Sequence, residues 1–81
     1  MTDIKLLDRI DINPAILVGK PVIKGTRLSV QFIVGLLAAG MTIEDILAEY
    51  PRLQKEDILA CLQFATKALE SNVFLPFEQP A

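Results

Sequence analysis

Residues 42–70 read TIEDILAEYPRLQKEDILACLQFATKALE, two helix-forming runs separated by a proline. Thr42 is a suitable N-cap, and Asp45 three residues later makes a variant of the capping box. These residues predict a helix over 43–49. The helix ends before Pro51, because the residue that precedes a proline avoids helical geometry.

The second run predicts a helix over 55–70. Glu56 and Asp57 favour its first turn, where negative charge complements the helix dipole. The cap position holds Gln54, a poor capping residue that Ser or Thr would improve by about 1 kcal/mol. Two helices joined by a short turn have the spacing of a helix-turn-helix unit.

A further helix and an extended segment precede this pair. Ser29 is a plausible N-cap for a helix that runs to about Ala39, and Gly40 suits the left-handed position after its last turn. Before Ser29, residues 10–12 alternate as in a strand, and Val22-Ile23 is a second β-prone pair. The expected fold is mostly α: a three-helix, helix-turn-helix bundle preceded by a short N-terminal β element.

The chain of 81 residues reads as a single domain, 1–81, with three parts: an N-terminal extended or β segment (1–28), a three-helix core (29–71) and a C-terminal tail (72–81). A domain of this size is marginally stable, and one cysteine without any histidine provides neither a disulfide nor a zinc site. Hydrophobic residues make up 52% of the chain, above the usual fraction. Oligomerisation or an unusually apolar core is therefore expected to stabilise the domain, and a helix over 29–39 that is apolar on two sides favours a homodimer.

Each helix carries an apolar stripe that we assign to the core. The stripes are Val30, Ile33, Val34 and Leu37, then Ile43, Ile46, Leu47 and Tyr50, then Ile58, Leu62, Ala65 and Leu69. The helix over 29–39 is also apolar on its other side, through Phe32, Leu36 and Ala39, which we expect to meet another subunit or the N-terminal strands. The tail residues Phe74, Leu75 and Phe77 either dock on a partner or fold back over the core, and the sequence leaves both open.

Four short motifs, before and within the helical segments, carry a resemblance to a known family. Over residues 12–65 the chain resembles a bacterial family called domain of unknown function 433. The motifs are Asn13-Pro14, GKPVIKGTRL at 19–28, LAAGMTIEDIL at 37–47 and YPRL at 50–53. Gln54 departs from the family's common Thr or Ser. The resemblance implies a homeodomain-like helix-turn-helix fold and a role as the antitoxin of a toxin–antitoxin pair, whose toxin resembles a PIN-type ribonuclease.

Basic residues gather near the first helix. Residues 13–42 contain no acidic residue but three basic ones, Lys20, Lys24 and Arg27. Together with the free amides at a helix N-terminus, they are candidate contacts for a nucleic-acid phosphate. Alternatively they are ordinary surface charges, with Arg27 paired to a helix carboxylate.

The start of the last helix is the second candidate nucleic-acid contact, through Arg52, Gln54 and Lys55, because DNA readers use this position. Residues 42–57, however, carry five acidic and two basic residues, which opposes phosphate binding. A scaffold that shares the helix-turn-helix geometry without reading DNA is the favoured interpretation.

No set of residues predicts catalysis. The segment 19–26 contains Gly-Lys and Gly-Thr, but a phosphate-cradling loop needs Gly-Lys-Ser/Thr at the start of a helix. Cys61 lacks a histidine to activate it, and we expect a packed thiol. The helix carboxylates are expected to form a solvated face: Glu44, Asp45, Glu49, Glu56, Asp57 and Glu70.

The sequence therefore predicts a binding module and not an enzyme, with no cofactor, no metal and no membrane partner. A cytoplasmic location is expected, since no export signal or apolar run of about 20 residues is present. The leading hypothesis is the antitoxin that the resemblance implies, binding a PIN-like toxin and operator DNA. The alternative is a homodimeric protein-interaction module without a nucleic-acid role.

Overall fold

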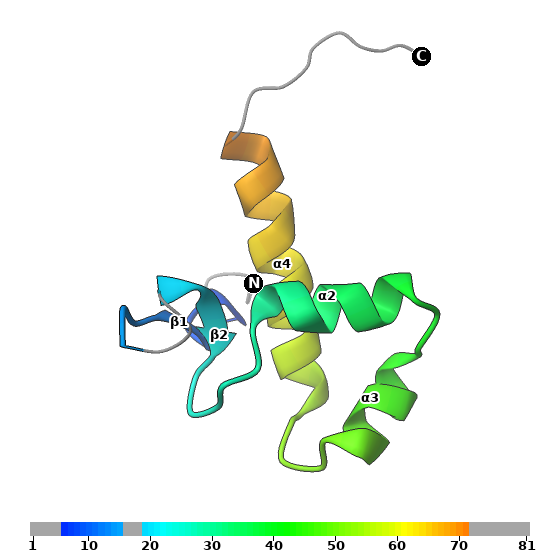
Figure 1. Ribbon diagram of the computed structural model, residues 1–81. Coiled ribbons are helices and arrows are strands. Elements are labelled where there is room, and N and C mark those ends of the chain that lie inside the picture. The colour runs from blue at the N-terminus through cyan, green and yellow to red at the C-terminus, as the bar shows by residue number, and fades with distance from the viewer. Residues whose placement is uncertain (1–5, 16–18, 72–81) are drawn as a thin grey trace, which may run out of the picture.

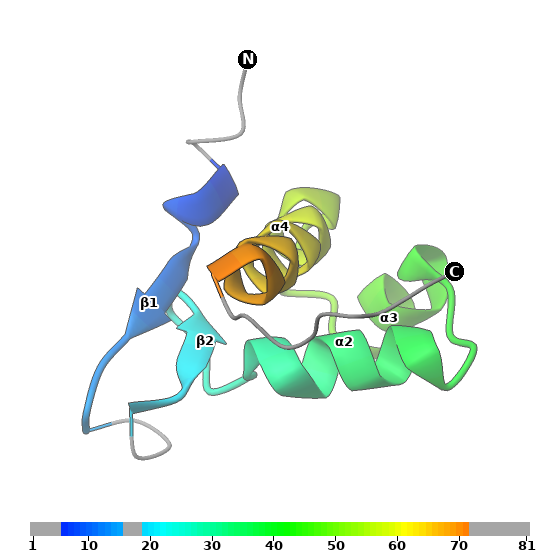
Figure 2. The ribbon, with the colours of Figure 1, turned by 90° about the horizontal axis from the view of Figure 1, so that it is seen from above.

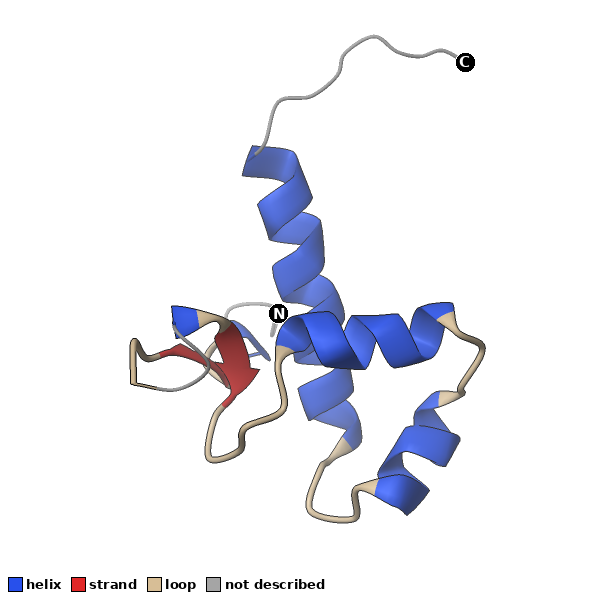
Figure 3. Cartoon of the chain, viewed as in Figure 1, coloured by secondary structure: helices blue, strands red, loops and turns tan. Residues whose placement is uncertain are grey.

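The computed structural model describes residues 6–15 and 19–71 of the chain (Figure 1). After the helical residues Leu6 and Leu7, the elements are β1 (Ile10–Ile12), β2 (Pro21–Ile23), α2 (Val30–Ala38), α3 (Ile43–Glu49) and α4 (Lys55–Ser71). Figure 3 shows that helices predominate in the described part and that the two strands lie together at one side. The predicted fold class, mostly helical with a short N-terminal β element, is confirmed.

The predicted helix ends are confirmed by their hydrogen bonds. The hydroxyl of Ser29 accepts from the backbone N–H of Phe32 at 2.9 Å, so Ser29 is the N-cap of α2. Thr42 and Asp45 form a full capping box, with hydrogen bonds of 3.0 and 3.1 Å. Gly40 has φ +105°, the left-handed conformation expected after α2.

The two strands pair antiparallel and pack against the helices. Ile10 lies opposite Ile23, and Ile12 lies opposite Pro21. Ile23 is 2% exposed and belongs to the hydrophobic core. A two-stranded element of this length is marginal alone, so this packing is what stabilises it.

The long helix α4 organises the molecule. Figure 2 shows α4 nearly end-on, with β1 and β2 on one side, α3 on the other and α2 running across it. The core fills the space between these elements and consists of Ile23, Val30, Ile33, Ile46, Leu53, Ile58 and Cys61. Within the described ranges, no helix is both long enough and apolar enough to cross a bilayer.

The predicted core stripe of α4 is wrong in its second half. Leu62 is 38% exposed and Leu69 is 60% exposed. Ile58 is buried as predicted, but the other buried residues of α4 are Asp57, Ala60 and Cys61, so the stripe that meets the core is rotated relative to the predicted one. The apolar spacing gave no way to tell the covered face from the uncovered one, because α4 is apolar on both.

The predicted exposure of Asp57 is also wrong. Asp57 was predicted to lie in a solvated carboxylate face, but the residue is only 8% exposed. The remaining predicted surface acids, Glu44, Asp45, Glu49, Glu56 and Glu70, are exposed. Asp57 differs because its carboxylate has partners at the start of α4.

Candidate functional site

The first turn of α4 is held by the Asp57 carboxylate. Its Oδ2 atom accepts from the backbone N–H of Gln54 at 2.8 Å, and its Oδ1 atom accepts from Arg9 Nη1 at 3.0 Å. The same Arg9 nitrogen donates to Gln54 Oε1 at 3.3 Å. A carboxylate three residues after the cap position is the acidic half of a capping box. Asp57 therefore has a structural role, and Arg9 is the partner that sequence reasoning missed.

A signal for this arrangement is present in the sequence. The segment TIED at 42–45 and the segment QKED at 54–57 place an aspartate at the same distance from the helix start. In the first segment Thr42 completes the box with its hydroxyl. In the second, Gln54 occupies the threonine position and its side chain accepts from Arg9 instead.

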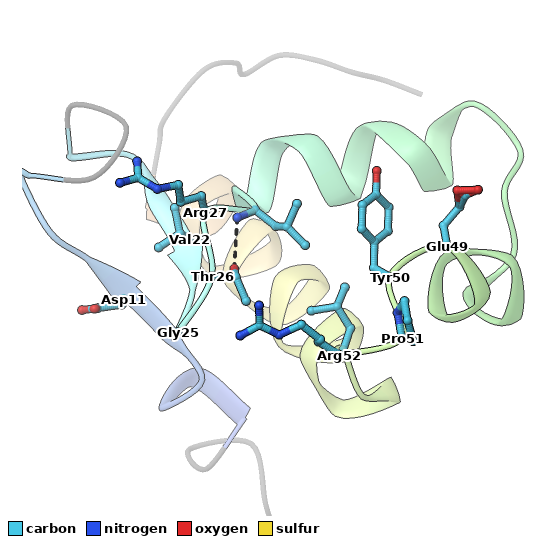
Figure 4. A pocket seen from close by; sticks show the side chains of 11 residues that line it. Asp11, Val22, Gly25, Thr26, Arg27, Glu49, Tyr50, Pro51 and Arg52 are labelled. Atoms are coloured by element: carbon cyan, nitrogen blue, oxygen red, sulfur yellow. Dashed lines mark hydrogen bonds between the residues drawn. The ribbon is translucent and has the colours of Figure 1, made fainter.

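A cleft of about 690 Å³ lies between the β2–α2 loop and the α3–α4 turn (Figure 4). We call it the arginine cleft, because Arg27 stands on the loop side and Arg52 on the turn side. The complete lining is Asp11, Val22, Gly25, Thr26, Arg27, Leu28, Glu49, Tyr50, Pro51, Arg52 and Leu53.

The loop wall of the arginine cleft is fixed by the Thr26 hydroxyl. This hydroxyl donates to the carbonyl oxygen of Ile23 at 2.7 Å and accepts from the backbone N–H of Leu28 at 3.0 Å. The backbone N–H of Ile23 donates to the carbonyl oxygen of Leu28 at 2.9 Å, which closes the loop. Gly25, with φ +81°, supplies the left-handed residue that this tight turn requires. The prediction that the glycine here serves a turn is confirmed.

The turn wall is anchored to the core. The backbone N–H of Leu53 donates to the carbonyl oxygen of Tyr50 at 2.9 Å, and the Leu53 side chain is 6% exposed. The ring of Tyr50 meets the ring of Phe32 edge to face, with centroids 6.0 Å apart and planes at 85°. Both walls are therefore formed before any ligand arrives.

The charges of the arginine cleft balance. Arg27 and Arg52 contribute two positive charges, and Asp11 and Glu49 contribute two negative ones. Arg27 and Arg52 are exposed and form no ion pair with any residue that the structure describes. The alternative in which Arg27 pairs with a helix carboxylate is therefore wrong. Figure 4 shows the Arg52 side chain extending across the cleft toward the loop, whereas Arg27 points outward.

The three basic residues predicted to act together do not line one hollow. Lys20 lines a second hollow, which lies between α2 and α4, while Arg27 lines the arginine cleft. Lys24 is exposed in the turn after β2 and lines neither. Of the other predicted nucleic-acid contacts, Gln54 and Lys55 are exposed at the start of α4, and only Arg52 reaches the arginine cleft.

The α2–α4 groove has a volume of about 340 Å³. Its lining is mostly apolar and consists of Lys20, Pro21, Ser29, Val30, Gln31, Val34, Phe64, Ala65 and Ala68. The groove therefore follows α4 along one face as far as Ala68.

The predicted interface residues of α2 have different environments. Phe32 is 41% exposed and Ala39 is exposed, so both are accessible on this chain. Leu36 is half-buried and packs against the core. The tail residues Phe74, Leu75 and Phe77 lie outside the described residues.

The surroundings of Cys61 determine the state of its thiol. Cys61 is fully buried, and burial, aided by the nearby Asp57 charge, raises the pKa of its thiol to about 12. The thiol is therefore protonated and unreactive at neutral pH, as predicted. Within residues 6–15 and 19–71, no three His, Cys, Asp or Glu side chains are grouped so as to hold a metal ion.

Comparisons with known proteins give one match. The model of a family described as "Protein of unknown function (DUF433)" matches residues 10–65. Searches of curated proteins and of solved structures find no match. The matched residues include both walls of the arginine cleft and the buried half of α4.

Proposed function

We propose that this chain, which belongs to the DUF433 family of proteins of unknown function, is a protein-binding module that acts as the antitoxin of a toxin–antitoxin pair. Its partner is a toxin that resembles a PIN-type ribonuclease, and the pair acts in the cytoplasm. The antitoxin role comes from the family resemblance, and the binding role comes from the surface of α4.

The observation that carries this proposal is the exposed apolar face at the end of α4. Leu62 and Leu69 are 38% and 60% exposed and lie seven residues apart, so they share one face of the helix. The apolar α2–α4 groove runs along the same half of α4. We take this uncovered apolar surface of α4 as the site where the toxin packs.

Two side chains that could act as a general base or a nucleophile are not accessible to a substrate, which supports a binding role. Asp57 is committed to Arg9 and to the backbone of Gln54. Cys61 is buried and protonated. A nucleophile or a general base must reach its substrate, and these two groups do not reach the surface.

Co-purification tests the proposal. The chain is co-expressed with a nuclease-like protein encoded by the adjacent gene, and a stable complex is expected. Changing Leu62 and Leu69 together to Glu is expected to weaken the complex at least tenfold. Ile12→Glu is the matched control, because Ile12 is also an exposed apolar residue, 58% exposed, but lies on β1.

Two results would count against the proposal. If no complex forms, the toxin is not the partner of this chain. A complex that tolerates the leucine changes, in a variant whose helix content by circular dichroism is normal, moves the interface away from α4.

A homodimer without a nucleic-acid role is the second candidate function. It is supported by Phe32 and Ala39, which expose apolar surface on α2. Sedimentation at micromolar concentration is expected to show a dimer, and a stable monomer would reject it. Apolar surface on both α2 and α4 is compatible with one self-contact and one toxin contact.

Operator DNA is a further proposed ligand, either of the basic residues before α2 or of the helix-turn-helix unit. The candidate contacts are all exposed: Lys20, Lys24 and Arg27 in the first case, Arg52 and Lys55 in the second. The five acidic residues against two basic ones in 42–57 oppose the second case. A gel shift with the upstream DNA at low salt tests whether the chain binds DNA. If the combined alanine variant of Lys20, Lys24 and Arg27 weakens the shift and flattens its salt dependence, the result supports DNA binding. If the original chain gives no shift, DNA is not a ligand.

A further inference from the structure

We propose that the arginine cleft binds an extended peptide segment of a partner protein, one that carries a carboxylate next to an apolar side chain. This inference goes beyond the proposed function, because the cleft is a second surface. It involves the turn before α4, whereas Leu62 and Leu69 lie on the second half of that helix.

The first argument is the apolar interior of the arginine cleft. Leu28 and Tyr50 are half-buried and Pro51 is exposed, so these three form the accessible apolar lining, while Val22 and Leu53, 1% and 6% exposed, add little surface. Its volume of about 690 Å³ falls in the usual range for ligand sites, about 300–1,000 Å³. Such a lining favours an apolar side chain of the ligand.

The second argument is the pair of arginines at its mouth. Arg27 and Arg52 have no acidic partner within the described part of the chain, and Arg52 extends across the opening (Figure 4). A guanidinium pairs with a carboxylate through two parallel hydrogen bonds. A ligand carboxylate above the apolar lining would therefore meet Arg52 first, with Arg27 at the outer edge.

The third argument is the presence of two acids in the same lining, which favours a peptide over a nucleic acid. A nucleic-acid strand carries a phosphate at every residue, and its affinity depends on positive charge. Asp11 and Glu49 cancel the charge of the two arginines, so the cleft provides no net positive charge. A peptide segment supplies one carboxylate to an arginine, and the rest of its backbone is uncharged, so Asp11 and Glu49 do not repel it.

The fourth argument is the rigidity of the walls. The Thr26 hydroxyl bonds fix the loop, and the buried Leu53 fixes the turn. A preformed site binds a flexible peptide with a smaller ordering cost than a site that must itself fold.

Selection from a phage-displayed library of random ten-residue peptides, with the full chain immobilised, tests the inference. Enriched peptides are expected to carry Asp or Glu within two positions of Leu, Ile or Phe. Fluorescence anisotropy with the synthesised winner is then expected to show that Arg52→Glu weakens binding at least tenfold and that Arg27→Ala weakens it about threefold.

The matched control is Lys55→Glu. Lys55 is an exposed cation close to Arg52 in sequence but is not part of the cleft lining. This variant has the same change in net charge as Arg52→Glu, and its peptide affinity is expected to stay within twofold of the original. Circular dichroism confirms that both variants are folded.

The inference is overturned by any of four results. These are a selection without enrichment, winners that lack acidic residues, equal losses in the Arg52 and Lys55 variants, and displacement of the peptide by a ten-nucleotide oligothymidine. A nuclease complex that is insensitive to Arg52→Glu leaves the antitoxin proposal intact. Peptide binding without any nuclease complex supports the inference about the arginine cleft and contradicts only the antitoxin proposal.

Discussion

The two halves of α4 belong to one helix but have opposite surroundings. In residues 55–61 a charged side chain, Asp57, is 8% exposed, while in residues 62–70 an apolar one, Leu69, is 60% exposed. In both halves the polarity of the residue predicts the wrong degree of burial. Burial along this helix is decided by which elements cover it and by the partners that each polar group finds there.

The covering elements explain the difference. The first half of α4 contacts the core residues Ile33 and Ile46 from α2 and α3, and Arg9 reaches its first turn. Along the second half, α2 covers only the face that ends at Ala68 in the α2–α4 groove. In Figure 1 this half extends beyond the rest of the described fold, which leaves the face of Leu62 and Leu69 uncovered.

The largest predicted effect compares one apolar residue from each half. Ile58→Ala leaves a cavity in the core, since Ile58 is 0% exposed, and is expected to lower the free energy of unfolding by about 3 kcal/mol. Leu69→Ala is expected to change it by less than about 0.5 kcal/mol. Urea unfolding followed by circular dichroism measures both, and equal losses would mean that Leu69 is covered in solution.

The next effect concerns the buried carboxylate. Asp57→Ala removes the acidic half of the capping box of α4 and leaves the Gln54 N–H without its acceptor, with an expected loss of about 2 kcal/mol. The adjacent exposed residue is the control, and Glu56→Ala is expected to stay within about 0.5 kcal/mol of the original. Thermal unfolding separates the two, and similar melting temperatures would contradict the role given to Asp57.

A pH effect should follow from Cys61, which lies at the end of the buried half. Burial raises the pKa of its thiol from 9.0 to about 12, so the folded state keeps a proton that the unfolded state loses. The stabilisation is therefore complete below pH 9 and is lost as the pH rises through 12. The loss is expected to be about 1.4 kcal/mol per pH unit in that window.

The control for this effect is Cys61→Ala, which lowers stability at neutral pH but removes the part of the alkaline slope that belongs to the thiol. Urea unfolding at pH 8 and at pH 10 in both proteins gives the comparison. Identical slopes would show that another group is responsible.

The smallest predicted effect is a gain. Gln54→Ser places a hydroxyl at the cap position of α4, as Thr42 does for α3, and is expected to stabilise the chain by about 0.5–1 kcal/mol. The change also removes the 3.3 Å contact from Arg9, which is worth less because Arg9 is partly exposed. A lower melting temperature would show that the Arg9 contact outweighs the cap.

Local signals in the sequence were sufficient for the helices of the fold. Ser29, Thr42 and Gly40 act on backbone groups within a few residues, so their roles follow from spacing alone. The face of α4 that meets the core does not follow in this way, because it depends on how α2 and the β pair lie against the helix. The apolar pattern therefore placed Leu62 and Leu69 in the core incorrectly.

The candidate site was less predictable than the fold. Arg27 and Arg52 were each recognisable as candidate contacts, but they are distant in sequence, and no spacing rule brings them to one cleft. Lys20 was grouped with Arg27 by proximity in sequence, although it lines the other hollow. The partner of Asp57 was missed for the same reason, since Arg9 is 48 residues away.

The contact between Arg9 and Asp57 has a consequence for the order of folding. Closing a chain segment of 48 residues costs about 3 kcal/mol of entropy, more than one partly exposed ion pair returns. We therefore expect the pair to form only after the core has brought its two ends together, and to be absent from the transition state. Removing Arg9 should consequently accelerate unfolding while the refolding rate stays the same, so this contact lengthens the lifetime of the native state without guiding the chain toward it.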